Sequence, residues 1–425
     1  MKYISTNGSG PAVGFREALF TGLAPDGGLY VPASMPAPGA PLRPSSLVDA
    51  CIRTAGPFAD EIPAADLASI AAAALSFPVP LVQLEEDLYL LELFHGPTFA
   101  FKDVGARFMA LCLSYFLAQE QRNVTLLVAT SGDTGSAVAH GFAGVPRIDV
   151  FVLYPSGKIS TLQEHQMTTL GGNIHALEVG GTFDDCQALV KKALTDRALS
   201  AHRMVTTANS INIGRLIPQM AYYAWGVRQL QDRTAMAPLV VVPSGNFGNL
   251  TAAVYARAMG VAIRGFAAAT NANDIVPEYF RSGSYAPRSS VRTLSNAMDV
   301  GDPSNFARLR HQYGDSLSHM HAEIDAVAID DVATLEEIRT TSASRGYLMD
   351  PHTAVGVAAA RRLRRPGVPV IVPATAHPAK FPDVVRRATG NDPDMPEALR
   401  TVLSRRKMSV QIPARYESFR ELLPA

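Results

Sequence analysis

The stretch VTLLVATSGDTGS, residues 124–136, contains the pattern that decides the fold, a short apolar run followed directly by a turn of small residues. Because residues 124–129 show no alternation of apolar and polar side chains, they are typical of a parallel strand buried on both faces. Five more such runs lie at residues 148–153, 174–179, 239–242, 263–269 and 368–372. Helix-length segments such as 249–259 separate them, as parallel crossovers require. The sequence therefore predicts an α/β fold, doubly wound, with mainly parallel strands.

Prolines and glycines, which interrupt helices and form turns, predict a separate N-terminal unit. Residues 25–45 are rich in both, residues 46–74 are rich in alanine with helical spacing, and Pro78 and Pro80 end that helical segment. A chain of 425 residues has room for two or three domains, and we place the first at residues 1–80. Residues 281–290 are polar and are expected to form an exposed loop.

Composition excludes several classes of function. Hydrophobic residues make up 47% of the chain, and 38 Lys and Arg balance 38 Asp and Glu, which argues against disorder and against nucleic acid as the main partner. No run of 18 apolar residues occurs, and residues 1–15 lack the apolar core of a signal peptide, so no membrane span and no export are expected. Cys51, Cys112 and Cys186 form no CxxC pair, which favours a reducing, cytoplasmic compartment and no metal site.

The segment HGPTFAFKD, residues 95–103, places Lys102 at the start of a stretch with helical spacing. The positive end of the helix dipole and the flanking Phe99 and Phe101 would both lower the pKa of this lysine. Such a lysine is a candidate Schiff-base amine. The ordinary alternative is a solvated lysine paired with Asp103, and this segment alone does not decide between the two.

Two glycine-containing loops follow expected strands, at residues 130–136 (TSGDTGS) and 244–249 (SGNFGN). In such loops successive backbone N–H groups can point at one anion, so two loops suggest two phosphates. Neither loop has the Walker A or the GxGxxG pattern, so a nucleotide-binding protein is a weak alternative. For each loop alone, a plain strand-to-helix connection is an equally good interpretation.

Two further segments carry polar residues. In residues 208–216, ANSINIGRL, the side chains of Asn209, Asn212 and Arg215 would share a face if the segment is helical, and Arg215 could hold a phosphate or a carboxylate. Helix capping and a surface arginine are the alternative there. In residues 374–381, ATAHPAKF, Thr375 follows a strand at the edge where such folds bind ligands, whereas His377 could be structural.

Together with YPSGKIS (residues 154–160) and APDGGLYVP (residues 24–32), these motifs resemble the threonine synthases of the fold-type II pyridoxal-phosphate enzymes. The resemblance extends from Met1 to about Phe381 and is closest to the branch with a distinct N-terminal domain. It implies a tryptophan synthase beta-like fold in which residues 81–425 form two α/β lobes with the active site between them.

The resemblance also implies site residues. Lys102 would carry pyridoxal 5'-phosphate, Thr375 would meet its ring nitrogen, and Asp133 would lie beside its 3′-oxygen, where many relatives have asparagine. The cofactor phosphate would be held by Gly245, Asn246, Phe247, Gly248 and Asn249. The substrate would be bound by Thr130, Ser131, Thr134, Asn209 and Arg215.

The reaction implied is the conversion of O-phospho-L-homoserine and water to L-threonine and phosphate, by a monomer or a homodimer. Lys102 would move the α-proton, and either the expelled phosphate or His95 would activate water. Two alternatives stay open: another fold-type II lyase, such as a serine or threonine dehydratase or a sulfhydrylase, which needs no second phosphate site, and a catalytically silent ligand-binding homologue.

Overall fold

The computed structural model describes residues 1–37, 42–120, 122–200 and 203–424, and it contains two mainly parallel sheets. The six-stranded sheet has the order β11 (Ile324–Ala328), β10 (Gly265–Thr270), β9 (Leu239–Pro243), β12 (Val370–Ala374), β4 (Leu88–Glu92), β3 (Leu81–Glu85). Its strands are parallel except in the β3–β4 hairpin. The five-stranded sheet is parallel throughout, in the order β13 (Ser409–Pro413), β7 (Ile174–Gly180), β6 (Ile148–Pro155), β5 (Val124–Ala129), β8 (Met204–Thr207).

Helices cover both faces of each sheet, as the continuous apolar runs predict. In β9, Val240 and Val242 belong to one buried cluster and Val241 to another, and in β5 the side chains of Leu126 and Leu127 are divided in the same way. One of these clusters is common to both sheets, so the two lobes share a core. The α/β prediction is confirmed.

All six strands expected from the sequence occur, with ends shifted by no more than two residues. Strands β3 and β4 were not predicted, because they form a hairpin and lack the helix-length segment that separates parallel strands. Strand β13 escaped notice because it is an edge strand with three of its five residues exposed. The expected helical segment 46–74 is two helices, α2 and α3, interrupted around Pro57 and Pro63.

The α-helices are α1 (Phe15–Thr21), α2 (Leu47–Ala55), α3 (Ala64–Ala74), α4 (Lys102–Leu117), α5 (Asp133–Phe142), α6 (Thr161–Thr168), α7 (Phe183–Leu194), α8 (Arg197–Ser200), α9 (Ile213–Leu216), α10 (Met220–Gln231), α11 (Gly248–Ala258), α12 (Ile275–Ser282), α13 (Phe306–Gln312), α14 (Leu317–His321), α15 (Asp331–Arg345), α16 (Pro351–Leu363), α17 (Pro382–Thr389), α18 (Glu397–Leu403) and α19 (Tyr416–Arg420). Short 3-10 turns are η1 (Gly56–Phe58), η2 (Ile217–Gln219), η3 (Asn296–Met298) and η4 (Pro378–Lys380). Residues 283–290 form the expected exposed loop, after Arg281 and Ser282 end α12.

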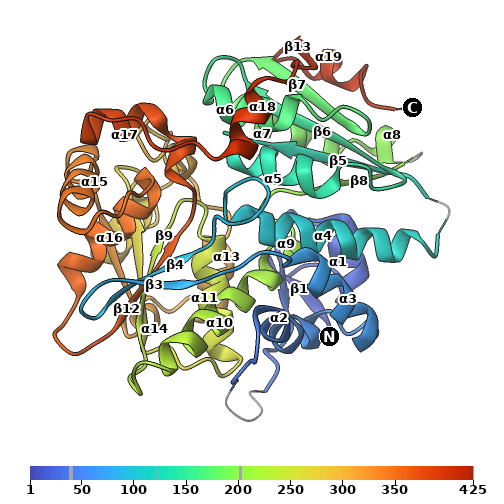
Figure 1. The fold of residues 1–425 in the computed structure, drawn as a ribbon. Helices are drawn as coiled ribbons and strands as arrows, with labels where there is room; N and C mark the ends of the chain where they lie inside the picture. Colours follow the sequence, from blue (N-terminus) through green and yellow to red (C-terminus); the bar gives the residue numbers. More distant parts are fainter. Residues whose placement is uncertain (38–41, 121, 201–202, 425) are drawn as a thin grey trace.

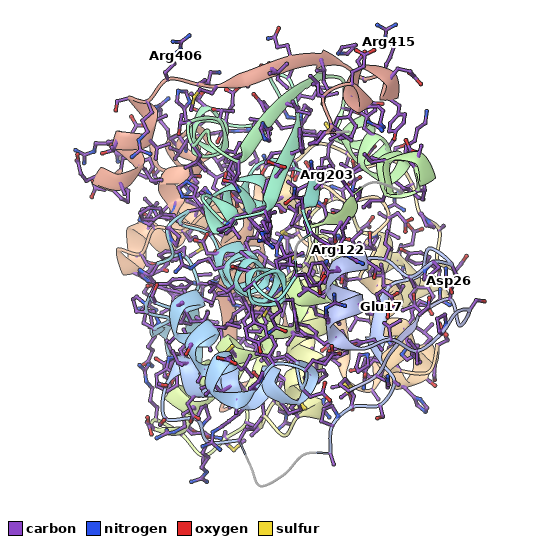
Figure 2. The ribbon with its side chains drawn as sticks, turned by 90° about the vertical axis from the view of Figure 1, so that its right-hand side faces the viewer. Glu17, Asp26, Arg122, Arg203, Arg406 and Arg415 are labelled. Atoms are coloured by element: carbon purple, nitrogen blue, oxygen red, sulfur yellow. The ribbon has the colours of Figure 1, made fainter. Side chains whose placement is uncertain are left out.

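The C-terminal segment joins the two lobes. Figure 1 shows the chain leaving α17 on one lobe and ending at β13 and α19 on the other, where β13 adds an edge to the five-stranded sheet. Arg406 and Arg415, just before and just after this strand, project outward from the molecule (Figure 2). Charged residues beside an edge strand oppose pairing with other chains. Across the described part of the chain, no helix is both long enough and apolar enough to cross a bilayer.

The N-terminal segment, with the small antiparallel sheet β1 (Tyr3–Ser5) and β2 (Tyr30–Pro32), packs against both lobes: α1 contacts β8 of the five-stranded sheet, and α2 contacts the other lobe. Helix α2 contacts α10, and the ring of Phe58 stacks on Tyr255 with a centroid distance of 6.5 Å. The apolar side chains of this segment belong to the cluster that both sheets share. Its position therefore depends on the rest of the core.

A buried arginine ties β2 to the loop before α9. Arg308 is 0% exposed, and its Nε donates to Tyr30 O at 3.0 Å while its Nη2 donates to Ile211 O at 2.6 Å. Its Nη1 donates to Asn305 Oδ1 at 2.6 Å. Burial lowers the pKa of Arg308 to about 10, so the side chain stays cationic at neutral pH. One side chain thus joins three segments that are distant in sequence.

We predict that Arg308→Met destabilises the chain strongly. Since a hydrogen bond to a charged group contributes about 1.5–3 kcal/mol, loss of these bonds should lower the free energy of unfolding by about 3 kcal/mol or more. Denaturant unfolding would measure it, with Arg339→Met as control. Arg339 is exposed, and among the described residues its ion pair is with Glu336, so its loss should change stability by no more than about 0.5 kcal/mol. Equal effects of the two variants would contradict the prediction.

Candidate active site between the two lobes

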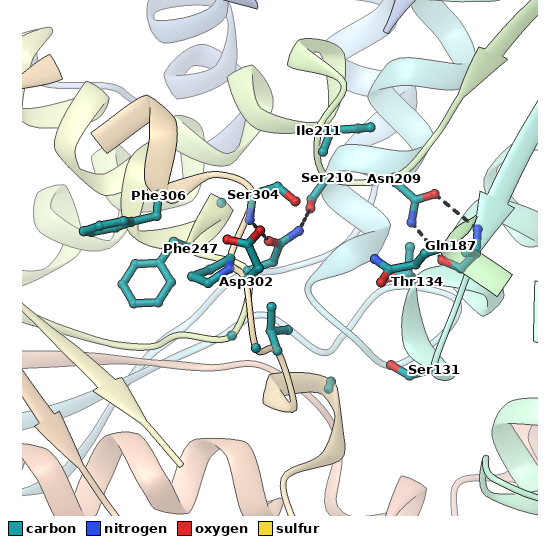
Figure 3. A pocket seen from close by; sticks show the side chains of 18 of the residues that line it. Ser131, Thr134, Gln187, Asn209, Ser210, Ile211, Phe247, Asp302, Ser304 and Phe306 are labelled. Atoms are coloured by element: carbon teal, nitrogen blue, oxygen red, sulfur yellow. Dashed lines mark hydrogen bonds between the residues drawn. The ribbon is translucent and has the colours of Figure 1, made fainter. Parts of the chain in front are cut away.

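The loops after the parallel strands of both sheets meet around a cavity of about 760 Å³. Every residue to which the sequence analysis gave a cofactor- or substrate-binding role lines this cavity: Lys102, Thr130, Ser131, Asp133, Thr134, Asn209, Arg215, Gly245, Asn246, Phe247, Gly248, Asn249 and Thr375. They follow β5, β8, β9 and β12 or begin α4. Figure 3 shows Ser131, Thr134 and Asn209 on one side of the cavity and Phe247 and Phe306 on the other.

Lys102 is the first residue of α4, and its half-buried side chain lines the cavity. Burial lowers the pKa of Lys102, and the positive charges of Lys380 and Arg215 lower it further against the opposing effect of Asp133 and Asp350. The Nζ atom is 5.3 Å from the ring centre of Phe101. A lysine in these surroundings gives up its proton more readily than one in water.

The neighbouring acidic residue does not neutralise Lys102. Asp103 is 0% exposed, and its carboxylate accepts hydrogen bonds from the backbone N–H of Thr98 at 2.9 Å and from the Thr98 hydroxyl at 2.7 Å. Burial raises the pKa of Asp103 to about 6, against these hydrogen bonds. The alternative of a solvated Lys102–Asp103 pair is therefore wrong. Phe99, expected to desolvate Lys102, instead packs edge-on against His377 at 5.7 Å.

The loop after β9 is shaped to surround an anion. Within the described ranges, no backbone N–H of residues 245–249 has a hydrogen-bond acceptor, and Phe247 adopts a left-handed conformation at the start of α11. A Cβ atom on Gly245 would lie 2.6 Å from Met298 Cα, so only glycine fits there. Asn249 accepts a bond from Tyr222 at 2.6 Å, but its buried Nδ2 is without a partner. These unpaired donors at a helix N-terminus make an anion site.

The loop after β5 has the same property. The hydroxyl of Thr130 accepts from the N–H groups of Gly132 at 2.9 Å and Gly135 at 2.8 Å, which tightens the turn. In the chain as described, the backbone N–H groups of Ser131, Asp133 and Thr134 lack acceptors. This loop is the second candidate anion site, and the Thr130 hydroxyl is already committed to its shape.

Asn209 and Arg215 complete that side of the cavity. Asn209 joins the ends of β8 and β5, because its Nδ2 donates to Ala129 O at 2.8 Å. Arg215 is 4% exposed, donates through Nη1 to Ala208 O, and has a buried Nε without a partner. Burial lowers the pKa of Arg215 to about 10, which leaves it cationic at neutral pH.

Thr375 is fixed through its backbone. Its carbonyl accepts from the N–H of Phe101 at 2.9 Å, and its N–H donates to the Thr353 hydroxyl at 3.2 Å. Its own hydroxyl, in contrast, has no hydrogen bond to any described residue. A buried hydroxyl that faces a cavity without a partner is available to a bound ligand.

Comparison with known proteins identifies the family. Family models match residues 2–75 ("Threonine synthase N terminus"), 75–370 ("Pyridoxal-phosphate dependent enzyme") and 353–423 ("Threonine synthase, C-terminal"). Threonine synthase from Escherichia coli (strain K12) is 41% identical over 428 residues, which cover 100% of this chain and 99% of that protein. The chain belongs to the threonine synthase family.

Solved structures of threonine synthases agree with this assignment. The crystal structure of PLP-bound threonine synthase from Brucella melitensis has a TM-score of 0.93 at 38% identity and covers 99% of this chain and 98% of that one. Threonine synthase from yeast has a TM-score of 0.90 at 34% identity and covers 99% and 97%. The expected fold-type II architecture is confirmed, and the cofactor is pyridoxal phosphate.

The cavity of this threonine synthase family member fits the cofactor. The free N–H groups of residues 245–249 and the unpaired Nδ2 of Asn249 are donors for a phosphate, and close packing at Gly245 keeps that loop open. Lys102 supplies an amine with a lowered pKa, and the Thr375 hydroxyl a free polar group.

The two interpretations of residues 209–215 can now be separated. The segment is not one helix, because α9 spans only Ile213–Leu216, and Asn212 is its N-cap as the capping alternative has it, with Nδ2 bonded to Leu19 O at 2.8 Å. His95, a candidate base, does not line the cavity, and its Nε2 is 2.7 Å from Glu92 Oε2. His377 is the N-cap of η4, which matches its structural interpretation.

Sequence reasoning missed several cavity residues. Sequence reasoning also missed that Lys380, which is fully buried and does not line the cavity, forms an ion pair of 2.7 Å with the cavity residue Asp133. The N-terminal segment also contributes to the wall, through Thr6, Asn7, Gly27, Gly28 and Leu29, and the exposed loop contributes Tyr285, Arg288, Ser289 and Ser290. The motif at residues 24–32 was the available signal for the first set. The contribution of the loop had no signal in the sequence.

We predict that Gly245→Ala lowers the melting temperature of the cofactor-free protein, because the new methyl group collides with the Met298 backbone. Gly248→Ala is the matched control in the same loop. There the nearest atom to a new Cβ is Asn305 Nδ2 at 3.4 Å, so stability should stay the same or rise slightly. Thermal unfolding checks both, and equal melting temperatures would contradict the packing argument.

Proposed function

We propose that this chain converts O-phospho-L-homoserine and water to L-threonine and inorganic phosphate. The observation that carries the proposal is the cavity, in which two loops with unpaired backbone N–H groups and the Lys102 amine face the same space. One loop suits the phosphate of the cofactor and the other the phosphate of the substrate. Membership of the threonine synthase family supports this reaction over others of the fold.

The cofactor side of the cavity is formed by Lys102, residues 245–249 and Thr375. We assign Lys102 as the residue that holds pyridoxal phosphate, the loop as the donor set for its phosphate, and Thr375 as the partner of its ring nitrogen. When bound, this cofactor stabilises the charge left when a bond to the substrate α-carbon breaks. Asp133 lies beside this site as a carboxylate, since the charges of Lys380 and Lys102 hold its pKa well below its usual range although burial opposes them.

The substrate side is assigned to Ser131, Thr134, Asn209 and Arg215, with Thr130 acting through the shape of its loop. Arg215 lines the cavity and brings a buried positive charge to it, which suits a doubly charged phosphate. The polar groups of Ser131 and Thr134 add donors next to the free N–H groups. Their convergence fixes the leaving group at one end of the cavity.

Lys102 is also the proposed carrier of the α-proton. Because burial lowers its pKa, its amine loses its proton more readily than that of a solvated lysine, and the neutral amine can accept a proton from carbon. For the activation of water the sequence offered His95 or the expelled phosphate. Since His95 lies outside the cavity, we assign this role to the phosphate.

The alternatives fit less well. A dehydratase or sulfhydrylase uses the Lys102 side and the first loop but has no need of a second anion site next to Arg215. A silent ligand-binding homologue would not need a lysine with a lowered pKa in the cavity. We further propose residues 1–80 as the N-terminal domain, residues 81–425 as the catalytic region, a cytoplasmic location, and a monomer or homodimer without metal.

The first test is chemical. Borohydride reduction of the protein with pyridoxal phosphate, followed by peptide mapping, should place the cofactor on Lys102. Lys158 is exposed, and Lys380 is fully buried and occupied, so neither should be labelled. The wild type should release phosphate from O-phosphohomoserine with threonine as the other product, and Lys102→Ala should abolish this. Turnover of serine or threonine alone would support a dehydratase instead.

The second test separates substrate from cofactor binding. Arg215→Ala should leave the absorption of bound pyridoxal phosphate intact and lower kcat/KM for O-phosphohomoserine by about 10- to 150-fold, because a charge-assisted bond contributes about 1.5–3 kcal/mol. Arg215→Lys should recover only part, since it lacks the fork. Arg288→Ala is the control, an arginine at the cavity mouth that Glu278 and Asp274 already neutralise. Loss of the cofactor from Arg215→Ala, with normal kinetics when it is resupplied, would move Arg215 to the cofactor site.

A further inference from the structure

A buried ion pair includes Asp133, which lines the cavity together with Lys102. Lys380, in η4, is 0% exposed, and its Nζ is 2.7 Å from Asp133 Oδ1 and 2.8 Å from Thr98 O. Asp133 is 4% exposed, and the same Oδ1 also accepts from Gln163 Nε2 at 2.9 Å. Two charges removed from water in this way are costly unless each is compensated, so the pair constrains both residues.

The Asp133 carboxylate interacts electrostatically with both lysines, and it forms its ion pair with Lys380. The charged groups that face Lys102 are Asp133 at the start of α5, Lys380 in η4, Arg215 in α9 and Asp350 before α16. Asp133 has the strongest effect of these on Lys102, and it lines the cavity. If no other cation held this carboxylate, an ammonium form of Lys102 would become its natural partner.

We infer that Lys380 is a positioning residue for Lys102: it holds the Asp133 carboxylate as its own partner and thereby leaves the Lys102 amine free to lose its proton. The inference rests on the proposed role of Lys102. Lys380 and Lys102 thus have different tasks, one as a permanent buried cation and the other as a reactive amine. Lys380 and Gln163 both donate to Oδ1 of Asp133, and these two contacts restrict the rotation of its carboxylate.

The pair has a structural role that must be separated from this electrostatic one. Lys380 also holds the Thr98 carbonyl, in the turn that precedes Lys102. Lys380→Gln removes the charge and keeps donors for Thr98 and Asp133, whereas Lys380→Met keeps the length of the chain without donors. Lys380→Arg keeps the charge. If the role of Lys380 is purely structural, the variants that keep hydrogen-bond donors should behave like the wild type. If the role is electrostatic, only the variant that keeps the positive charge should do so.

The experiment uses the full chain with pyridoxal phosphate bound. Borohydride mapping of the wild type comes first, because a label on another lysine would refute the proposed function and not this inference alone. The readouts are the pH midpoint of the absorption titration of the bound cofactor and the rate of cofactor uptake at pH 7 by the cofactor-free protein. Both report on Lys102 without measuring turnover.

Both charge-free variants should raise the midpoint by about one pH unit and slow the uptake about tenfold, since loss of a nearby positive charge favours the protonated amine. Lys380→Arg should stay within about 0.3 unit of the wild type. The double variant Asp133→Asn/Lys380→Met carries neither buried charge and should return to within about 0.5 unit. The double variant also provides a test of the inference if one of the single variants does not fold. Unchanged midpoints in the charge-free variants, or a double variant displaced upward by a full unit, would overturn the inference.

Discussion

The charge balance around Lys102 is the interaction on which the proposed site depends: for the role proposed here, the surroundings of this lysine have to disfavour its protonated form, and they do so in several ways. Burial at the start of α4 removes the water that would stabilise the ammonium form, and Arg215 adds a positive charge nearby. The negative charge of Asp133 raises the pKa of Lys102, but this carboxylate is paired with Lys380. The relative positions of α4, α5, α9 and η4 therefore determine the charges around Lys102 as well as the packing of the core.

The anion sites depend on backbone geometry more than on side-chain charge. In both loops the donors are N–H groups that have no acceptor within the described structure, at the start of α5 and of α11. Each loop has a local device that keeps it open: the Thr130 hydroxyl in one, and the close approach of Gly245 to Met298 in the other. Arg215 adds a buried positive charge to the wall of the same cavity.

The N-terminal segment is part of the site and not merely attached to it. Asn212 donates to Leu19 O and caps α9, so the helix that carries Arg215 is held against α1. Arg308 joins β2 to the loop that leads from Asn209 into α9. Residues of the same segment form part of the cavity wall. Packing of the N-terminal segment thus bears directly on the proposed substrate side.

The sequence by itself determined the fold class and the loops after β5, β9 and β12 that line the cavity. Uninterrupted apolar runs with helix-length spacers indicate buried parallel strands, and loops after such strands, as at Thr130, Ser244 and Thr375, converge at one edge of a sheet. Only the tertiary structure decided the charge state around Lys102. Lys380 and Asp133 are 247 positions apart, and nothing local to either predicts an ion pair. Local patterns report on neighbours along the chain, whereas the pKa of a buried group is set by whichever charges the folded chain brings next to it.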